Sequence, residues 1–179
     1  MTRVAVVTGG TRGIGEAISL KLQEKGRHVI ANYGGNDAAA KAFSERTGIA
    51  VQKWDVGDHK SCIDACAAIE AQFGQIDIMV NNASAISLTG TLETKMRRYD
   101  LMHQVNARGT FLCSQAALPY LLKADNPHIL NISPPLDMKP RWFGPHVAYT
   151  MAKYGMSLCV LGMAEEFRGK GVAVNALWP

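Results

Sequence analysis

The stretch that decides the fold is Thr8-Gly9-Gly10-Thr11-Arg12-Gly13-Ile14-Gly15. It follows the β-branched run Val4 to Thr8, which is typical of a buried strand, and it opens a segment of helical period. Glycines there allow a tight turn and let backbone N–H groups at a helix N-terminus approach a pyrophosphate. Gly9, Gly13 and Gly15 meet these needs, although an ordinary strand-to-helix turn could carry the same glycines.

Outward from this turn, short β-branched runs alternate with longer segments of helical period. The predicted strands are Val4 to Thr8, Val29 to Tyr33, Ile49 to Trp54, Ile76 to Asn81, His128 to Ser133 and Val172 to Leu177. The predicted helices are Gly13 to Lys25, Asp37 to Arg46, Lys60 to Phe73, Arg97 to Leu122 and Ala148 to Phe167. Apolar strands joined by crossover helices predict an α/β fold of the Rossmann type, with a doubly wound parallel sheet of six strands. Such a sheet binds ligands at the carboxyl ends of its strands.

The composition favours one domain that contacts small molecules. The chain has 179 residues, of which 47% are hydrophobic and 19% are charged, so one sizeable core is expected. Its net charge of +4 comes from scattered Lys and Arg residues, which predicts no nucleic-acid partner and no membrane partner. No stretch is long enough to span a bilayer, and no secretory signal precedes the first strand, so a cytoplasmic location is expected.

The four cysteines are Cys62, Cys66, Cys113 and Cys159, and they form no CxxC pair. This suits a reducing compartment. Cys62 and Cys66 could share one helix face as a metal or redox pair, but no His completes a ligand cluster. We therefore expect buried small apolar side chains and no metal.

Tyr149 and Lys153 are four residues apart in a predicted helix, so phenol and ammonium lie on one face. A tyrosine that acts as a general acid or base near neutral pH needs a nearby positive charge that favours its phenolate form. Ser133 ends the fifth predicted strand, where its hydroxyl could hydrogen-bond a substrate carbonyl. Taken separately, the pair could lie on a solvated helix, and Ser133 could simply start a turn.

Together, the spacing Gly9-x-x-x-Gly13-x-Gly15, Asn81-Asn82-Ala83 and the Ser133, Tyr149, Lys153 set resemble the short-chain dehydrogenase/reductase family. The resemblance runs from the first strand to the last residue. It implies four catalytic residues: Asn106, Ser133, Tyr149 and Lys153. Tyr149 would exchange a proton with the substrate oxygen, Ser133 would orient that oxygen, Lys153 would assist Tyr149 and hold the nicotinamide ribose, and Asn106 would anchor a water relay. Without the resemblance, Asn106 would be interpreted as a helix-kink or capping residue.

The same resemblance implies a nicotinamide dinucleotide site. The residues expected to hold the cofactor are Gly9, Thr11, Arg12, Gly13, Ile14, Gly15, Asn32, Tyr33, Asp55, Val56, Asn82, Ala83, Tyr149, Lys153 and Pro179. Ser84 stands where the family usually has a Gly, which tolerates positive φ more readily.

The residues at the end of the second predicted strand indicate which nicotinamide cofactor is preferred. An NAD site usually has a carboxylate at the end of this strand, where it binds the ribose 2′-hydroxyl. Here the strand ends Ala31-Asn32-Tyr33-Gly34-Gly35, without a carboxylate. Arg12 could reach a 2′-phosphate, or it could be a solvated cation. We predict a preference for NADP(H), with Arg12, Asn32 and Tyr33 near the extra phosphate.

The two halves of the chain resemble different branches of the family. Met1 to about Asn82 resembles bacterial acetoacetyl-CoA reductases, which use NADPH. From Asn81 onward the sequence resembles the hydroxysteroid dehydrogenase-like branch. The loop from Ser133 to Tyr149 is rich in proline and aromatic residues, and two interpretations stay open for it: a pocket wall or a rigid surface loop.

The resemblance also leads to expectations about the end of the chain and about assembly. After Ala176-Leu177-Trp178-Pro179 the family continues into a substrate lid and one more strand, so we expect the domain of residues 1–179 to be incomplete at its C-terminus. The leading hypothesis is an NADP(H)-dependent reductase of a ketone, such as a 3-oxoacyl thioester. The alternative is a nucleotide-binding protein with little or no turnover. A homodimer or homotetramer is expected to pack through the helices around 97–122 and 148–167.

Overall fold

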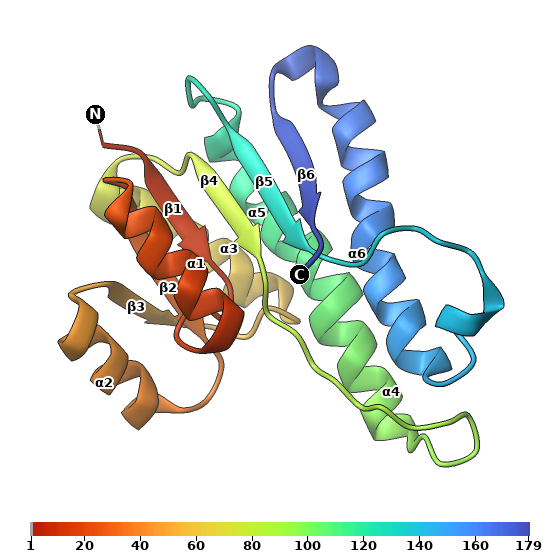
Figure 1. Cartoon of the computed structure of the whole chain (residues 1–179). Coiled ribbons are helices and arrows are strands. Elements are labelled where there is room, and N and C mark those ends of the chain that lie inside the picture. Colours follow the sequence, from red (N-terminus) through yellow and green to blue (C-terminus); the bar gives the residue numbers. More distant parts are fainter. Residues whose placement is uncertain (1) are drawn as a thin grey trace.

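In the computed structural model, which describes residues 2–179, six parallel strands form one sheet (Figure 1). The strands are β1 (Val4–Val7), β2 (His28–Tyr33), β3 (Ala50–Lys53), β4 (Ile78–Asn81), β5 (His128–Ile132) and β6 (Ala173–Leu177). Their order across the sheet is β3-β2-β1-β4-β5-β6, so strands are added outward in one direction from β1 to β3 and in the other direction from β4 to β6. A crevice at the carboxyl ends is expected between β1 and β4, where this direction changes. The prediction of a doubly wound parallel sheet is confirmed.

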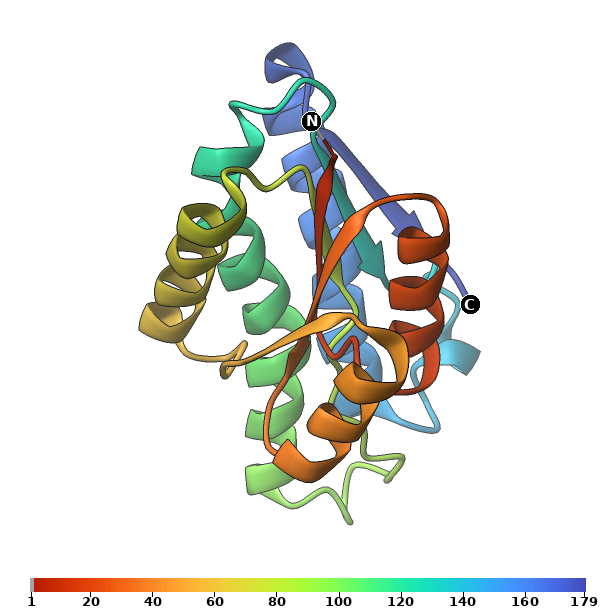
Figure 2. The same ribbon diagram turned by 90° about the vertical axis from the view of Figure 1, so that its left-hand side faces the viewer.

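Helices cover both faces of the sheet. The helices are α1 (Gly13–Glu24), α2 (Asp37–Thr47), α3 (His59–Phe73), α4 (Met96–Met102), α5 (Gly109–Leu121) and α6 (Val147–Glu166). Seen along the sheet, α1 and α2 lie on one side, and α3 and α5 lie on the other (Figure 2). Successive residues of β1 point to opposite faces: Val6 packs in the core beneath α3, α5 and α6, whereas Val7 packs in the core beneath α1 and α2. The near-continuous apolar strands are therefore explained by burial on both faces.

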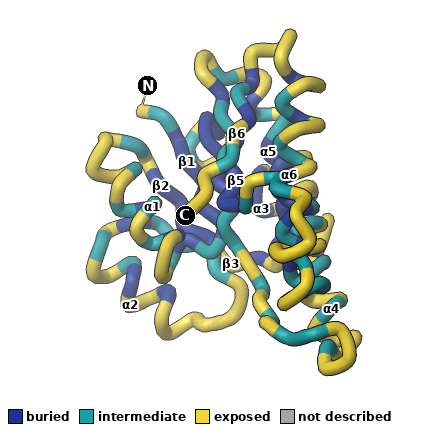
Figure 3. The backbone as a smooth tube through the Cα atoms, turned by 45° about the vertical axis from the view of Figure 1, so that its right-hand side comes forward, coloured by how far each residue is buried: buried dark blue, intermediate teal, exposed yellow. Residues whose placement is uncertain are grey.

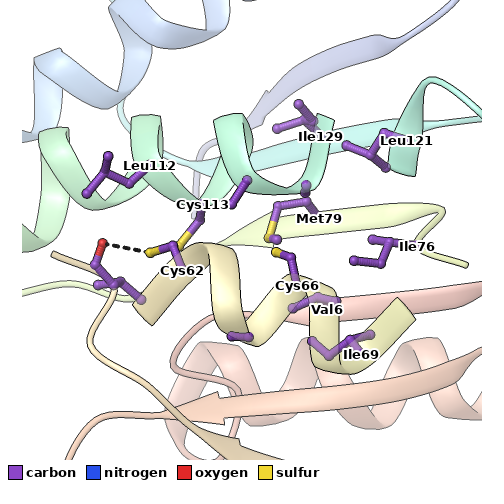
Figure 4. Close-up of a cluster of buried hydrophobic side chains, with 14 of the residues drawn as sticks. Val6, Cys62, Cys66, Ile69, Ile76, Met79, Leu112, Cys113, Leu121 and Ile129 are labelled. Atoms are coloured by element: carbon purple, nitrogen blue, oxygen red, sulfur yellow. Dashed lines mark hydrogen bonds between the residues drawn. The ribbon is translucent and has the colours of Figure 1, made fainter. Parts of the chain in front are cut away.

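Three cysteines belong to the core between α3 and α5 (Figure 4). Cys62, Cys66 and Cys113 are buried, and the sulfur atoms of Cys62 and Cys113 lie 3.7 Å apart. Burial raises the pKa of the Cys66 thiol to about 12, so this thiol is held in its neutral form. The expectation of buried apolar cysteines is confirmed for these three, whereas Cys159 is only partly buried.

The predicted single helix from Arg97 to Leu122 is wrong in one respect. The structure has α4, then a π-helical turn at His103–Arg108, then α5. Buried Asn106 lies in that turn, and its amide exchanges two hydrogen bonds with the backbone of Ala85: Ala85 N donates to Oδ1 at 2.8 Å, and Nδ2 donates to Ala85 O at 2.9 Å. A wider turn of this kind commonly marks a functional position in a helix. The hydrophobic period did not show it, because the hydrogen-bond partner of Asn106 is Ala85, which lies 21 residues earlier in the sequence.

Buried residues follow the strands and the inner sides of the helices, whereas the segments 84–95 and 134–146 are mostly exposed or half-buried (Figure 3). The second segment contains a short 3-10 helix, η2 (Pro140–Trp142), and a similar turn, η3 (Arg168–Lys170), precedes β6. Of the helices in residues 2–179, none combines the length and apolar character needed to cross a membrane.

Candidate active site

A cavity of about 530 Å³ lies at the carboxyl ends of the strands. Its lining comes from the α1 N-terminus, the loop after β4, the end of β5, the loop 134–146, the first turns of α6 and the chain after β6. The lining residues are Ile14, Asn82, Ser84, Ile132, Ser133, Pro134, Pro135, Asp137, Trp142, Tyr149, Thr150, Lys153, Tyr154, Trp178 and Pro179. One cavity thus joins the glycine turn to Ser133, Tyr149 and Lys153.

The glycine turn is fastened to the loop after β4. Asn82 donates from Nδ2 to the carbonyl oxygens of Thr8 at 2.9 Å and Gly9 at 3.1 Å. The Thr8 hydroxyl oxygen accepts from the backbone N–H groups of Asn82 at 2.9 Å and Ala83 at 3.0 Å. Asn82 and Ala83 therefore shape the turn through hydrogen bonds that fix its backbone.

The turn also leaves room for a phosphate group. Gly13 has a φ of 55°, and nothing lies within 4 Å of the place where a Cβ would stand. At Gly15 a Cβ would collide with the Gly9 carbonyl and the Asn82 amide. The N-cap residue Arg12 does not cap α1 with its side chain, so this side chain leaves the first-turn N–H groups free for a ligand. The turn fits a pyrophosphate of a nicotinamide dinucleotide.

On the adenosine side, the predicted residues divide into buried and exposed ones. Asn32 is 2% exposed, and its amide already accepts from Gly9 N at 3.1 Å and donates to Trp54 O at 3.0 Å. Arg12 is exposed and forms no salt bridge with any residue from 2 to 179. The Asn32 side chain is thus part of the scaffold, and Arg12 is available to a ligand.

A carboxylate that the sequence reasoning left out lies near the end of β2. Asp37, the first residue of α2, pairs with Lys53 of β3 at 3.0 Å. The hydrogen bond from Lys53 lowers the pKa of the Asp37 carboxyl, while desolvation and this carboxylate raise the pKa of the Tyr33 phenol. Asp37 lies four residues after Tyr33, the last residue of β2. The turn between β2 and α2 returns the Asp37 carboxylate to the Tyr33 side chain.

The remaining predicted cofactor residues lie around the turn and the next strand end. Thr11 is half-buried in the turn. Asp55 is exposed after β3, and its Oδ1 accepts from Gly57 N at 2.8 Å. Val56 is buried beneath α5. Of these three, Asp55 has the side chain most accessible to a ligand.

Ser133 has an unusual position for a polar side chain. It directly follows β5, it is 1% exposed, and its Oγ has no hydrogen-bond partner among the described residues. Its backbone N–H donates to Leu177 O at 3.2 Å, which fixes the residue against β6. Because buried hydroxyls are normally satisfied, an unpartnered one in a cavity indicates a ligand-binding position.

Tyr149 and Lys153 lie on the first turns of α6 and face the same cavity. The Lys153 ammonium donates to Ile132 O at 2.7 Å, and burial lowers the pKa of Lys153 to about 8. The ammonium therefore keeps its positive charge at pH 7, but it loses its proton at a lower pH than an ordinary lysine does. Asn106 is not among the residues that line the cavity, and its side chain bonds to Ala85 instead.

The sequence reasoning missed a second face of α6. Thr150, Tyr154 and Ser157 all donate to carbonyl groups of the loop 134–146. Their spacing of four and three residues is the signal that could have shown it, because such residues share one side of a helix. Within residues 2–179, no cluster of three or more His, Cys, Asp and Glu side chains is suited to a metal ion.

Comparisons with known proteins agree with this geometry. The family model of the short chain dehydrogenases matches residues 3–179. A similar protein, hydroxysteroid dehydrogenase-like protein 2 of Danio rerio, is 52% identical over 97% of this chain, and the match spans 44% of that protein. The chain therefore spans less than half the length of this curated relative.

Two solved structures share the fold across the chain. A short chain dehydrogenase of Mycobacterium thermoresistibile is 40% identical with a TM-score of 0.91, over 99% of this chain and 67% of that one. A metagenomic short-chain oxidoreductase in complex with NADP is 30% identical with a TM-score of 0.88, over 99% of this chain and 81% of that one.

Proposed function

The chain belongs to the short-chain dehydrogenase/reductase family, and from that premise we propose that it interconverts a ketone and a secondary alcohol with NADP(H). A 3-oxoacyl thioester is one candidate substrate. The observation that carries the proposal is the buried, unpartnered hydroxyl of Ser133 in the cavity that Tyr149 and Lys153 also line.

Each catalytic side chain has one task in this reaction. The Ser133 hydroxyl donates a hydrogen bond to the ketone oxygen and holds it in place. Tyr149 gives its phenolic proton to that oxygen as the alcohol forms, and takes it back in the reverse direction. The positive charge of Lys153 stabilises the phenolate that remains. Asn106 fixes the π-helical turn and the loop at Ala85, and in this proposal it supports the site from outside the cavity.

A bound nicotinamide supplies the hydride for reduction at the carbonyl carbon. Gly9, Thr11, Gly13, Gly15 and the N-terminus of α1 would hold the pyrophosphate. Asn82 and Ala83 would contact the adenosine side together with Asp55 and Val56, and Ile14 and Pro179 would lie along the nicotinamide half. Lys153 would hydrogen-bond the ribose.

The preference for NADP(H) is supported by the charges near the end of β2. Arg12 is exposed and unpaired among the described residues, whereas the Asp37 carboxylate is paired with Lys53. The similar oxidoreductase solved with NADP is consistent with this choice. Arg12 and Tyr33 would face the 2′-phosphate, and the buried amide of Asn32 would support the strand beneath them.

The experiment that tests the proposal is NADPH consumption, followed by absorbance. The substrates are acetoacetyl-CoA, longer 3-oxoacyl thioesters, ketosteroids and simple ketones, and Tyr149→Phe is measured beside the parent protein. We expect turnover in the parent and a loss of about a thousandfold in Tyr149→Phe. NADPH binding without turnover of any substrate would overturn the proposed reaction and favour a nucleotide-binding role.

We further propose a homodimer or homotetramer. Large apolar side chains are exposed along α5 and α6, including Phe111 at 48%, Leu158 at 58% and Leu161 at 60%. Exposed apolar side chains on neighbouring helices favour association with a second copy. Sedimentation analysis of the parent and of Leu158→Glu, Leu161→Glu tests this, and a monomeric parent would contradict it.

A further inference from the structure

We propose that the loop 134–146, here called the substrate wall, is held ready-made by Thr150, Tyr154 and Ser157, and that Trp142 on this wall selects ketones that carry a bulky apolar group. This inference rests on the proposed function, because it names the substrate class of the same site. It also decides between the two interpretations of the loop, a pocket wall or a rigid surface loop.

Three buried side chains of α6 fasten the substrate wall. The Tyr154 hydroxyl donates to Asp137 O at 2.6 Å, the Ser157 hydroxyl to Pro134 O at 2.6 Å, and the Thr150 hydroxyl to Trp142 O at 3.1 Å. These donors are 9%, 4% and 9% exposed, so water competes little for the bonds. The wall is thus anchored near its start, its middle and its 3-10 turn to the same helix that carries Tyr149 and Lys153.

The Trp142 side chain is fixed although it is 52% exposed. Its Nε1–H donates to Asp137 Oδ2 at 2.8 Å, and the Arg141 guanidinium lies 4.9 Å from the ring centroid. Arg141 is not among the residues that line the cavity, whereas Trp142 is. One side of the indole is therefore covered by a cation, and the ring remains available to a molecule in the cavity.

The surface around Trp142 is mainly apolar. Pro134, Pro135 and Trp178 line the same cavity. The Asp137 carboxylate also lines it, but it is already bonded to Trp142 and accepts from Lys139 N at 3.1 Å. A small ketone needs only the hydroxyls of Ser133 and Tyr149, whereas a ring or branched chain would bury area against this wall. A wall that is ordered before binding makes that burial more effective, since little ordering remains to be done.

The inference predicts which ketones each variant still reduces. We compare butanone with cyclohexyl methyl ketone, using NADPH and the full chain. For Trp142→Ala we expect kcat/KM for the cyclohexyl ketone to fall about 10- to 100-fold, since a large contact area is removed, and kcat/KM for butanone to stay within about twofold. The NADPH dissociation constant should not change.

The anchoring residues have their own test. Tyr154→Phe and Thr150→Val should raise KM for the cyclohexyl ketone about three- to tenfold, because a looser wall weakens the binding of the bulky group. Thr150→Ser keeps the hydroxyl and should restore the parent KM. Tyr120→Phe, on α5, is the matched control, because Tyr120 does not line the active-site cavity.

The outcomes separate this inference from the proposed reaction. Equal losses for both ketones in Trp142→Ala, or no loss for either, would overturn the role of Trp142. Unchanged KM values in Tyr154→Phe and Thr150→Val would overturn the anchoring role. If the parent binds NADPH but reduces neither ketone, the proposed reaction is overturned, and the selection of bulky ketones is tested by binding alone. Calorimetry should then show tighter binding of the cyclohexyl ketone than of butanone. Loss of that difference in Trp142→Ala would support selection, and its absence in the parent would overturn it.

Discussion

Two groups of buried and half-buried polar side chains differ in their hydrogen bonding. Around the glycine turn, Thr8, Ser19, Asn32 and Asn82 all hydrogen-bond to backbone groups. At the catalytic end of the cavity, the Ser133 hydroxyl has no partner, and the Lys153 ammonium donates to Ile132 O but is partly buried, with its pKa lowered to about 8. The first group holds the backbone of the turn in place. In the second group, a bound ligand would supply the missing hydrogen bond of Ser133 and stabilise the charge of Lys153.

This difference separates stability, at the glycine turn, from function, at the catalytic end of the cavity. Removing a satisfied buried group leaves its partner unpaired and destabilises the fold. Removing an unsatisfied group, or a charge that burial disfavours, should cost little stability or even add some. Substitutions in the two groups test this difference.

Gly15→Ala should give the largest effect on the turn. Its methyl group would meet the Gly9 carbonyl and the Asn82 amide, and the backbone cannot move away without breaking the hydrogen bonds of Asn82. We expect a loss of about 3 kcal/mol or more in the free energy of unfolding, and no NADPH binding. Chemical denaturation measures this change. Gly162→Ala is the control, because this exposed position of α6 has open space around it. Equal stability of the two variants would contradict the account.

Lys153→Met should abolish reduction and yet stabilise the fold at pH 7. The pKa of Lys153 is about 8 in the folded protein and 10.5 for an ordinary lysine. Below pH 8 the folded protein carries the buried charge, and removing it outweighs the hydrogen bond that Ile132 O loses, so the free energy of unfolding should rise by about 1–3 kcal/mol. As pH rises from 8 to 10.5, the folded parent loses this proton before the unfolded chain does, so the parent gains stability and the advantage of the variant shrinks. Thermal unfolding at pH 7 and pH 10 measures it, and an advantage that grows with pH would contradict the assignment.

Arg12→Gln should have a smaller effect that concerns the cofactor only. If Arg12 faces the 2′-phosphate, its loss should weaken NADPH binding about tenfold and leave NADH binding unchanged, because a charge-assisted hydrogen bond is removed. Fluorescence titration with both cofactors measures this. Asp37→Asn should act in the opposite direction, with NADPH binding about two- to threefold tighter, because an anion near the same position is removed. Equal changes for NADH and NADPH would show that Arg12 does not discriminate between them.

Most of the fold followed from local sequence signals. The runs around β1, β4 and β5 are apolar on both faces, so they predicted buried parallel strands, and the glycine turn fixed where the first helix begins. The π-helical turn at Asn106 could not be predicted in this way. It depends on hydrogen bonds between Asn106 and Ala85, which are 21 residues apart in the sequence.

The site was predictable where a motif carries it, and not where tertiary contacts do. Spacing placed Tyr149 and Lys153 on one helix face, and both line the cavity with Ser133. The Asn32 amide looked available to a phosphate because its bonds to Gly9 and Trp54 exist only in the folded sheet. Likewise, the pairing of Asp37 with Lys53 and the anchoring of the substrate wall join segments that no local pattern connects.

The most direct test of the account makes the same substitution at two buried serines. Ser19 and Ser133 are 0% and 1% exposed, but the Ser19 hydroxyl donates to Gly10 O at 3.0 Å, whereas the Ser133 hydroxyl has no partner among the described residues. The account predicts that Ser19→Ala loses about 1–3 kcal/mol of stability and keeps kcat at saturating NADPH. Ser133→Ala should keep its stability and lose about a hundredfold or more in kcat. A destabilised Ser133→Ala that still turns over at the parent rate would contradict the account.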